Sequence, residues 1–422
     1  MTTLNERQNK VLQHFKNGDN IFLTGSAGTG KTYLVKHIRE ICETNKMSIA
    51  LTAMTGTAAY LIGGKTLHSW AGIGLGDKSV EELVDKIGKY PVSLMRWINT
   101  KILIIDEISM MSSILLEKLN EIGQILRSSK KPFGGIQLIF SGDFYQLPPV
   151  VKEEDSLFCF ESMVWNQLID VNVVLDEIIR QKEPSFQKCM EEARKGKLSE
   201  ETIDILNTCL GKKITDKIIP TKIYSYRENV DSINSNNLKK LGSTIKTFKS
   251  NYYTKYNGKK TLLCEEDSYL NNMKTSLQYN KYIKLSVGSQ VMLTINLNSD
   301  SGLTNGSRGV VIEFKNNFPV VLFKNGDIIE IPPYELKCDI LNKTIYIEQI
   351  PLILAWAITV HKSQGASIDL AEIDLGSTLF AYGQGYVALS RVRNIEGLSL
   401  IAFEPRKIRA HPKVKQFYKL LK

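Results

Sequence analysis

The clearest chemical signature of the chain is a glycine-rich stretch near its N-terminus. The residues IFLTGSAGTGKT, from Ile21 to Thr32, contain the spacing GxxxxGK[ST] between an apolar run and a segment with helical apolar spacing. Glycines let the backbone turn tightly and bring its N–H groups close to phosphate oxygens, and the helix start adds a partial positive charge. The pattern therefore predicts a P-loop that binds a nucleotide. The glycines expected to contact phosphates are Gly25, Gly28 and Gly30.

Two further side chains at the end of this loop have separate expected tasks. Lys31 would reach the β- and γ-phosphates of a nucleoside triphosphate, and the hydroxyl of Thr32 would help to hold Mg²⁺. A strand before the loop and a helix after it are the context that a P-loop requires. We therefore expect this loop to position a nucleotide together with a magnesium ion.

Two later apolar runs end in polar residues that could complete the site. KILIIDEISMM, from Lys101, reads as a strand that ends at Asp106 and Glu107. Asp106 suits water-mediated Mg²⁺ coordination, and Glu107 can orient and deprotonate an attacking water. The run IQLIFSGDFYQLPPV places Gln146 just beyond another strand, where it could contact the γ-phosphate, although a plain exit from a strand explains the same residues. After a P-loop, this combination indicates nucleotide hydrolysis.

The rest of the chain narrows the class of P-loop protein. A GTPase would need a guanine-reading element of the NKxD type, and the closest string, NKTI at Asn342, lacks the Asp. A small-molecule kinase would normally be shorter than 422 residues and would not need a second core. A nucleic-acid motor needs a second core with an arginine that faces the nucleotide. Arg180 and Arg391 are candidates, although a surface salt bridge would explain either arginine alone.

The charge distribution suits a polyanionic partner. The formal net charge is +10, and Lys and Arg outnumber Asp and Glu most strongly in 210–284 and 404–422. Clustered cations bind nucleic acids without sequence preference because they displace condensed counterions. A solvated, lysine-rich surface is the alternative that charge alone leaves open.

Composition describes an ordinary globular protein, with 43% hydrophobic and 23% charged residues. No apolar run reaches the roughly 20 residues that span a bilayer, and the N-terminus has no signal-peptide pattern. We therefore expect an intracellular protein with no membrane partner. The 6 cysteines are scattered without a CxxC pair, so reduced thiols are expected instead of a zinc site or disulfides.

Several long strings occur together in one order along the chain: LNERQ, GSAGTGKT, ALTAMTGTAAYLIGGKTLHSWAGIG, IIDEISM, SGDFYQLPPV, LDEIIRQ, LTNGSRGVV, WAITVHKSQGASID and GQGYVALSRVRNIEGLSL. Nearly end to end, the chain resembles the PIF (petite integration frequency) DNA helicases, within the 5′-to-3′ superfamily-one group that includes RecD-like enzymes. The resemblance implies an ATP-dependent DNA helicase that translocates 5′ to 3′ on single-stranded DNA and unwinds duplex. Replication, repair, recombination and telomere maintenance are the processes that it implies.

The resemblance also assigns roles at the nucleotide. ATP and Mg²⁺ are the expected cofactors, and Gln8 in LNERQ is the expected adenine contact. Arg180 and Arg391 would pull the second core onto the γ-phosphate, so that hydrolysis depends on closure of the cleft.

The stretch WAITVHKSQGASID, from Trp356 to Asp369, combines residue types that serve in nucleophilic catalysis, metal binding and anion binding. A nucleophilic site lacks an orienting carboxylate within TVHKSQG, the central part of this stretch, and a metal site lacks a second and third ligand nearby. By the resemblance, this stretch is a DNA-contacting element of the second core. Its side chains expected to contact the nucleic-acid backbone or to brace the loop are Thr359, His361, Lys362 and Ser363.

The stretch TGTAAYLIGGKTLHSWAGIG has the matching role in the first core. Thr55, Thr57 and His68 are hydrogen-bonding groups suited to phosphates. Trp70 could stack on a base, with packing in the core as the alternative.

Strands that alternate with helical stretches predict parallel-sheet α/β cores, which the resemblance identifies as RecA-like. We place the first core at 1–175, with a small wedge-like insertion at 72–90, and the second core at 176–241 and 351–422. Between them, 242–350 contains short apolar strands and Asn-Gly turns, which predict a small accessory β-barrel.

The expected partners are single-stranded and forked DNA, bound by a monomer. RNA–DNA hybrids, quadruplexes and an RNA-directed motor remain open, because backbone contacts distinguish the sugar only through its 2′-OH. A protein that clamps nucleic acid under nucleotide control, without unwinding it, would carry the same motifs and is the competing class. Protein partners cannot be identified from the sequence.

Overall fold

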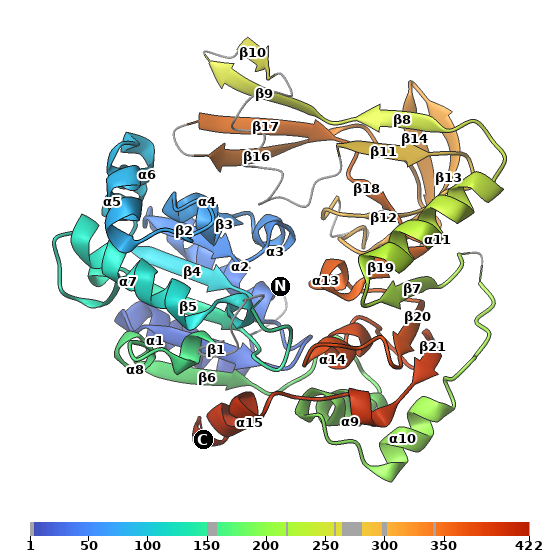
Figure 1. Ribbon diagram of the computed structural model, residues 1–422, viewed down its shortest axis with the longest axis horizontal. Helices are drawn as coiled ribbons and strands as arrows, with labels where there is room; N and C mark the ends of the chain where they lie inside the picture. The colour runs from blue at the N-terminus through green and yellow to red at the C-terminus, as the bar shows by residue number, and fades with distance from the viewer. Residues whose placement is uncertain are drawn as a thin grey trace.

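The computed structural model describes residues 4–149, 158–216, 218–256, 259–263, 281–297, 302–340 and 343–421. The described strands form two parallel and three antiparallel sheets. Figure 1 shows the first parallel sheet, in blue to green, beside the second, with the antiparallel sheets above both in this view. The mixed α/β class with parallel-sheet cores, predicted from the sequence, is confirmed.

The first parallel sheet has 6 strands in the order β3-β2-β4-β5-β1-β6. Alternate residues of β1 belong to different hydrophobic clusters: Ile21 and Leu23 to one, and Phe22 to the other. The sheet is therefore covered on both faces, which is why its strands are almost continuously apolar. Its strands are β1 (Ile21–Gly25), β2 (Ile49–Ala53), β3 (Lys65–Thr66), β4 (Ile102–Asp106), β5 (Gln137–Gly142) and β6 (Val171–Leu175).

Helices follow these strands in the alternation that the sequence indicates. The first helix begins with a capping box, in which Asn5 and Gln8 each accept a hydrogen bond from the other's backbone N–H. The helices of this half are α1 (Glu6–Asn17), α2 (Lys31–Thr44), α3 (Gly56–Leu61), α4 (Leu67–Ala71), α5 (Val80–Gly88), α6 (Pro91–Asn99), α7 (Ser113–Leu126) and α8 (Trp165–Leu168), with short 3₁₀ turns at Ile108–Met110, Pro132–Gly135 and Cys159–Glu161.

The segment predicted as a wedge is helical. Helix α5 occupies Val80–Gly88 and is capped by Ser79, and α6 begins directly afterwards at Pro91. The indole of Trp97 on α6 is fully buried and donates a hydrogen bond of 3.0 Å to the carbonyl of Ala71. This contact fixes the helix pair to the first core. Its role in separating DNA strands stays a prediction.

The second parallel sheet has 4 strands in the order β19-β7-β20-β21. Its strands come from both sides of the antiparallel region: β7 (Thr221–Tyr224), β19 (Ala357–Thr359), β20 (Ala371–Leu375) and β21 (Leu398–Phe403). The helices of this half are α9 (Pro184–Lys195), α10 (Glu200–Asn207), α11 (Arg227–Lys240), α13 (Val360–Ser363), α14 (Gln384–Leu389) and α15 (Pro412–Leu420), with a 3₁₀ turn at Pro405–Lys407.

The region between the two parts of the second sheet is β-rich, as predicted. This region has a small hydrophobic cluster of its own, which includes Leu285, Val291 and Val311. Strand β18 joins this region by pairing with β12, although it lies beyond the expected boundary at residue 350; the domain boundaries themselves stay a prediction. The strands are β8 (Lys246–Lys249), β9 (Asn251–Tyr256), β10 (Lys259–Leu262), β11 (Tyr282–Leu285), β12 (Gln290–Leu293), β13 (Arg308–Lys315), β14 (Phe318–Phe323), β15 (Ile328–Glu330), β16 (Tyr334–Ile340), β17 (Lys343–Gln349) and β18 (Leu352–Leu354).

The C-terminal helix α15 returns to the first sheet. The ring of Phe417 lies 6.0 Å from the ring of Phe22 on β1 and 5.4 Å from that of Phe144, centroid to centroid. Helix α15 of the second half therefore packs directly against the first sheet, so the two halves are joined by side-chain contacts as well as by the chain.

Two expectations about the chain as a whole can be compared with the structure. None of the helices in the described ranges has the length and apolar character that crossing a membrane needs. The cysteines whose side chains are described are buried, unpaired thiols, as expected: Cys42, Cys159, Cys189 and Cys209.

Candidate functional site

A cavity of about 1050 Å³ lies between the two parallel sheets. Residues from both halves line it, together with the tip of the β-rich region at Asn305. Among the predicted nucleotide-handling residues, those facing this cavity are Gln8, Gly28, Gly30, Lys31, Thr32, Asp106, Glu107, Gln146, Arg180 and Arg391. The structure thus brings together residues from distant parts of the sequence. Of the residues predicted to handle the nucleotide, only Gly25 does not line this cavity.

The P-loop links β1 to α2 in a conformation that requires glycine. A Cβ on Gly25 would lie 2.3 Å from the carbonyl oxygen of Leu175, and one on Gly28 would lie 2.6 Å from the Cβ of Arg180. Gly30 caps α2 with φ 90°, a backbone region that other residues rarely adopt. Gly25 therefore contributes by close packing against β6, and Gly30 by starting the helix whose N–H groups face the cavity.

Lys31 is folded back onto its own loop. Its Nζ donates to the carbonyl oxygens of Gly25 and Ser26, at 2.7 and 3.0 Å. Burial lowers the pKa of Lys31, while the charges of Asp143 and Glu107 act in the opposite direction. The ammonium group is therefore held at the loop before a phosphate arrives.

Asp106, the last residue of β4, is held by hydrogen bonds. Asp106 accepts hydrogen bonds from the Ser141 hydroxyl at 2.7 Å and from the backbone N–H of Glu107 at 3.0 Å. Burial raises the pKa of Asp106, and hydrogen bonds from Ser141 and from the hydroxyl of Thr32 lower it. Thr32 and Asp106 are therefore neighbours, as a shared magnesium ion would require.

Glu107 has an unusual backbone for a residue with a side chain, with φ 54° and ψ 45°. Such left-handed residues are strained and concentrate at functional sites. Its carboxylate accepts a hydrogen bond of 2.9 Å from Nε2 of Gln364, which belongs to the second half of the molecule. Burial and the charge of Asp106 raise the pKa of Glu107 to about 7, the range in which a general base is effective.

The two arginines converge on Ser390. Arg180 donates to the carbonyl oxygen of Ser390 at 3.0 Å, and Arg391 donates to the Ser390 hydroxyl at 2.7 Å. Burial lowers the pKa of both guanidinium groups, and Arg391 lowers that of Arg180 further. Within the described residues neither arginine forms a salt bridge, so the pair presents buried positive charge to the cavity.

Several features of this cavity fit a magnesium–nucleotide complex. Nε2 of Gln8 is buried and has no hydrogen-bond partner among the described residues, so a ligand could satisfy it. The arginine pair suits an anion. No group of three His, Cys, Asp or Glu side chains in the described ranges could hold a metal alone. Thr32 and Asp106 therefore suit Mg²⁺, which takes few protein ligands and completes its shell with water and phosphate oxygens.

The predicted DNA-contacting residues of the first core divide into two groups. Thr55 caps α3 by accepting a hydrogen bond from the backbone N–H of Ala58, and Thr57 lines a second, smaller cavity next to Lys362. His68 is half-buried, and this burial lowers its pKa. Trp70 is 3% exposed, so the base-stacking hypothesis gives way to the core alternative.

Trp70 is buried because it packs against Trp97 of α6. The ring centroids of Trp70 and Trp97 are 4.6 Å apart. Both indoles belong to the largest hydrophobic cluster. In this structure Trp70 therefore fastens α4 to α6 and presents no face to a base.

The predicted DNA-contacting residues of the second core also fall into two groups, one buried and one partly exposed. Thr359 accepts a hydrogen bond of 3.2 Å from the backbone N–H of Lys362, and the Ser363 hydroxyl donates to the carbonyl oxygen of Val360 at 2.7 Å. These two side chains brace the loop, one of the two roles expected for them. His361 and Lys362 are only partly buried, so they are the members of the motif that a partner can reach.

Sequence reasoning missed Gln364, which reaches across the cleft to Glu107. Its position within the string TVHKSQG was the only signal, because nothing in the sequence pairs it with an acid far away in the chain.

Comparisons with known proteins agree with this geometry. A family model described as PIF1-like helicase matches residues 3–213, and one described as the 2B domain of DNA helicase Pif1 matches residues 268–314. The ATP-dependent DNA helicase PIF1 of Danio rerio is 39% identical over 429 residues, which cover 99% of this chain and 64% of that protein. The chain therefore spans less than two thirds of that relative.

Two solved structures are similar over almost the whole chain. The crystal structure of Pif1 helicase from Candida albicans is 35% identical, with a TM-score of 0.83 and coverage of 100% of both chains. Bacteroides Pif1 bound to single-stranded DNA is 29% identical, with a TM-score of 0.68, and the match covers 100% of this chain and 97% of that one. Because its motifs gather in one cleft and almost its whole length is matched by these relatives, the chain belongs to the PIF1-like helicase family.

Proposed function

We propose that this chain is an ATP-dependent DNA helicase, which hydrolyses ATP, moves 5′ to 3′ along single-stranded DNA and unwinds duplex. The observation that carries the proposal is the cavity between the two parallel sheets, lined by P-loop, acidic and arginine residues from both halves. Relatives named as ATP-dependent DNA helicases support the same activity. The direction of movement rests on the family alone.

The first half of the molecule would bind and cleave the nucleotide. Gln8 would contact the adenine, while Lys31 and the N–H groups at the start of α2 bind the phosphates. Thr32 and Asp106 would hold Mg²⁺, which neutralises charge on the phosphate oxygens. Glu107 would take a proton from the attacking water, and its raised pKa suits this task.

The second half would complete the site only when the cleft closes. Arg180 and Arg391 would stabilise the negative charge that spreads over the γ-phosphoryl group during transfer. Gln146, in the loop after β5, would contact the γ-phosphate, so this contact would form with ATP and be lost with ADP. Binding of ATP would therefore favour the closed arrangement, and hydrolysis would release it.

The nucleic-acid grip lies next to this machinery. The carbonyl oxygen of Ser363 accepts a hydrogen bond of 3.4 Å from Arg391, and the next residue, Gln364, contacts Glu107. His361 and Lys362 on α13, with Thr55, Thr57 and His68 in the first core, would contact the DNA backbone. Movement requires only that the two grips differ in affinity between the open and closed states.

We propose single-stranded and forked DNA as partners, acting inside the cell during replication, repair or recombination. A relative bound to single-stranded DNA supports the first partner. A monomeric state stays a prediction, and action on RNA–DNA hybrids or quadruplexes stays open.

The test is ATP hydrolysis by the full chain, measured with and without single-stranded DNA. The proposal requires hydrolysis that DNA stimulates and that Lys31→Ala abolishes, because the substitution removes the cation that binds the phosphates. Lys16→Ala, at an exposed position on α1, is the matched control and should behave as wild type. Hydrolysis that persists in Lys31→Ala would contradict the assignment of the site.

A further inference from the structure

The P-loop and the strand before it are hydrogen-bonded to the second half of the molecule. Thr24 of β1 and two P-loop residues, Ser26 and Ala27, contact three different helices that follow the first sheet. The pairs are Thr24 with Tyr418 of α15 at 2.6 Å, Ser26 with Glu191 of α9 at 3.0 Å, and Ala27 with Tyr386 of α14 at 2.7 Å.

A buried carboxylate joins these helices. Asp143, which follows β5, accepts two hydrogen bonds of 2.9 Å from the guanidinium of Arg194. It also lies 3.1 Å from the hydroxyl of Tyr418 and 3.4 Å from that of Tyr386. Burial alone would lower the pKa of Arg194, but the charge of Asp143 and its hydrogen bonds raise it well above the usual range. Arg194 therefore stays charged, and Asp143 joins it to the two tyrosines by hydrogen bonds.

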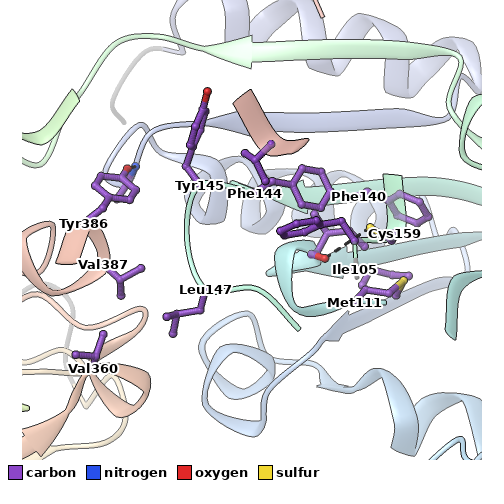
Figure 2. Packing of buried hydrophobic residues seen from close by; sticks show 14 of the residues in the cluster. Ile105, Met111, Phe140, Phe144, Tyr145, Leu147, Cys159, Val360, Tyr386 and Val387 are labelled. Carbon is purple, nitrogen blue, oxygen red and sulfur yellow. Dashed lines mark hydrogen bonds between the residues drawn. The ribbon is translucent and has the colours of Figure 1, made fainter. Parts of the chain in front are cut away.

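Tyr386 differs from the other members of this network. Its hydroxyl accepts a hydrogen bond from the backbone N–H of Ala27, so it is the side chain in the network that contacts a P-loop amide. Burial raises the pKa of Tyr386, which keeps the phenol protonated and able to donate to Asp143. Figure 2 shows Tyr386 and Val387 in the same hydrophobic cluster as Tyr145 and Leu147 of the loop after β5.

The helix that carries Tyr386 also reaches the rest of the site. A Cβ on Gly383, which caps the start of α14, would lie 2.4 Å from the carbonyl oxygen of Gln146. Beyond the end of α14, Arg391 donates a hydrogen bond to the carbonyl oxygen of Ser363. This short helix and the residues that flank it thus contact the loop bearing Gln146, the P-loop, and the stretch proposed to bind DNA.

We propose that Tyr386 is a positioning residue for ATP, which holds the P-loop in its binding shape through the amide of Ala27. This inference rests on the proposed function. It means that a residue of the second half, Tyr386, helps to fix the conformation of the P-loop in the first half. Without the hydroxyl, the Ala27 amide is buried without its acceptor, and the loop has to be ordered again when the nucleotide binds. Tyr386 acts through the loop and does not touch the nucleotide.

The test compares Tyr386→Phe with Tyr418→Phe. Each change removes one hydroxyl that contacts Asp143 and keeps the ring, but only Tyr386 contacts the P-loop amide. We expect Tyr386→Phe to raise the KM for ATP about fivefold, the effect of one net hydrogen bond, with kcat within about twofold of wild type. Tyr418→Phe loses a bond to the Thr24 side chain of β1 and none to a loop residue, so it should leave KM within about twofold of wild type, although both variants should lower Tm.

A second readout separates this inference from the proposed function. Direct binding of fluorescently labelled ADP by the full chain requires no hydrolysis, and its affinity should fall about fivefold in Tyr386→Phe alone. Equal affinities in wild type and Tyr386→Phe, or equal losses in both variants, would overturn the role of Tyr386. Absence of hydrolysis by the wild-type chain would instead contradict the proposed function and leave the binding comparison valid.

Discussion

Nε2 of Gln364 lies 2.9 Å from a carboxylate oxygen of Glu107 and donates a hydrogen bond to it across the cleft. Glu107 is the proposed base for ATP hydrolysis, and Gln364 lies in the stretch proposed to bind DNA, directly after Ser363. The contact therefore joins the two proposed functions through a single pair of side chains. If α13 binds DNA as proposed, a shift of α13 would change the partner of Glu107 and with it the reactivity of the base.

The pH dependence of hydrolysis tests this contact. Burial and Asp106 raise the pKa of Glu107 to about 7, and the hydrogen bond from Gln364 lowers it. A base works in its ionised form, so kcat should rise with pH through about 7 in the wild-type chain. Gln364→Leu removes the bond and should move this rise to higher pH by about half to one unit.

The matched control is Gln124→Leu, which removes an exposed hydrogen bond to the carbonyl oxygen of Lys130. Its pH profile should coincide with that of wild type. A profile for Gln364→Leu that also coincides with wild type would show that the contact does not act on the base.

Removal of Arg391 tests closure of the cleft. Arg391→Ala should keep ATP binding but lower kcat by at least about 100-fold, because an arginine that stabilises the transferring phosphoryl group is worth about 10³ to 10⁵ in rate. Arg406→Ala, at an exposed position, is the control. Nucleotide binding and single-turnover hydrolysis should be measured together, with circular dichroism to check folding. Near-normal turnover would refute the role of Arg391.

The salt dependence of DNA binding tests the grip on α13. Lys362→Ala should weaken single-stranded DNA binding and make the slope of log K against log salt shallower by about one unit, because one phosphate contact is lost. Lys16→Ala removes an exposed lysine from the opposite half and should leave the slope unchanged. An unchanged slope in Lys362→Ala would place the DNA path elsewhere.

The buried ion pair behind the P-loop predicts a stability effect. Arg194→Met leaves the fully buried Asp143 without its charged partner, which should lower the free energy of unfolding by about 3 to 5 kcal/mol. Adding Asp143→Asn to this variant removes the unpaired charge and should recover part of the loss. Denaturant unfolding of both variants gives the comparison. An Arg194→Met chain as stable as wild type would mean that water reaches Asp143.

Local patterns in the sequence were sufficient for the nucleotide-binding loop. The glycines of GSAGTGKT and the acids after KILII are each fixed by a strand and its neighbouring turn, so short-range rules place them. The convergence of Arg180 and Arg391 on one cavity was expected only through the family resemblance, because the two residues lie far apart in the chain.

Contacts between distant segments could not be predicted. Gln364 with Glu107, and Tyr386 with Ala27, each join the two halves of the molecule, and no period or spacing connects them. Trp70 shows the other limit, since an indole suits base stacking and core packing equally well until its neighbour is known. That neighbour, Trp97, lies on α6, beyond the insertion predicted at 72–90, and no pattern in the sequence pairs the two indoles.

The most direct test of the account is ATP-driven strand displacement on two duplexes that differ only in whether the single-stranded tail is 5′ or 3′. The account predicts that the wild-type chain opens the 5′-tailed duplex alone and that Lys31→Ala opens neither. Opening of the 3′-tailed duplex alone would contradict the proposed direction. If neither duplex opens while DNA still stimulates hydrolysis, the result contradicts a helicase and favours a nucleotide-controlled clamp or a translocase without a working wedge.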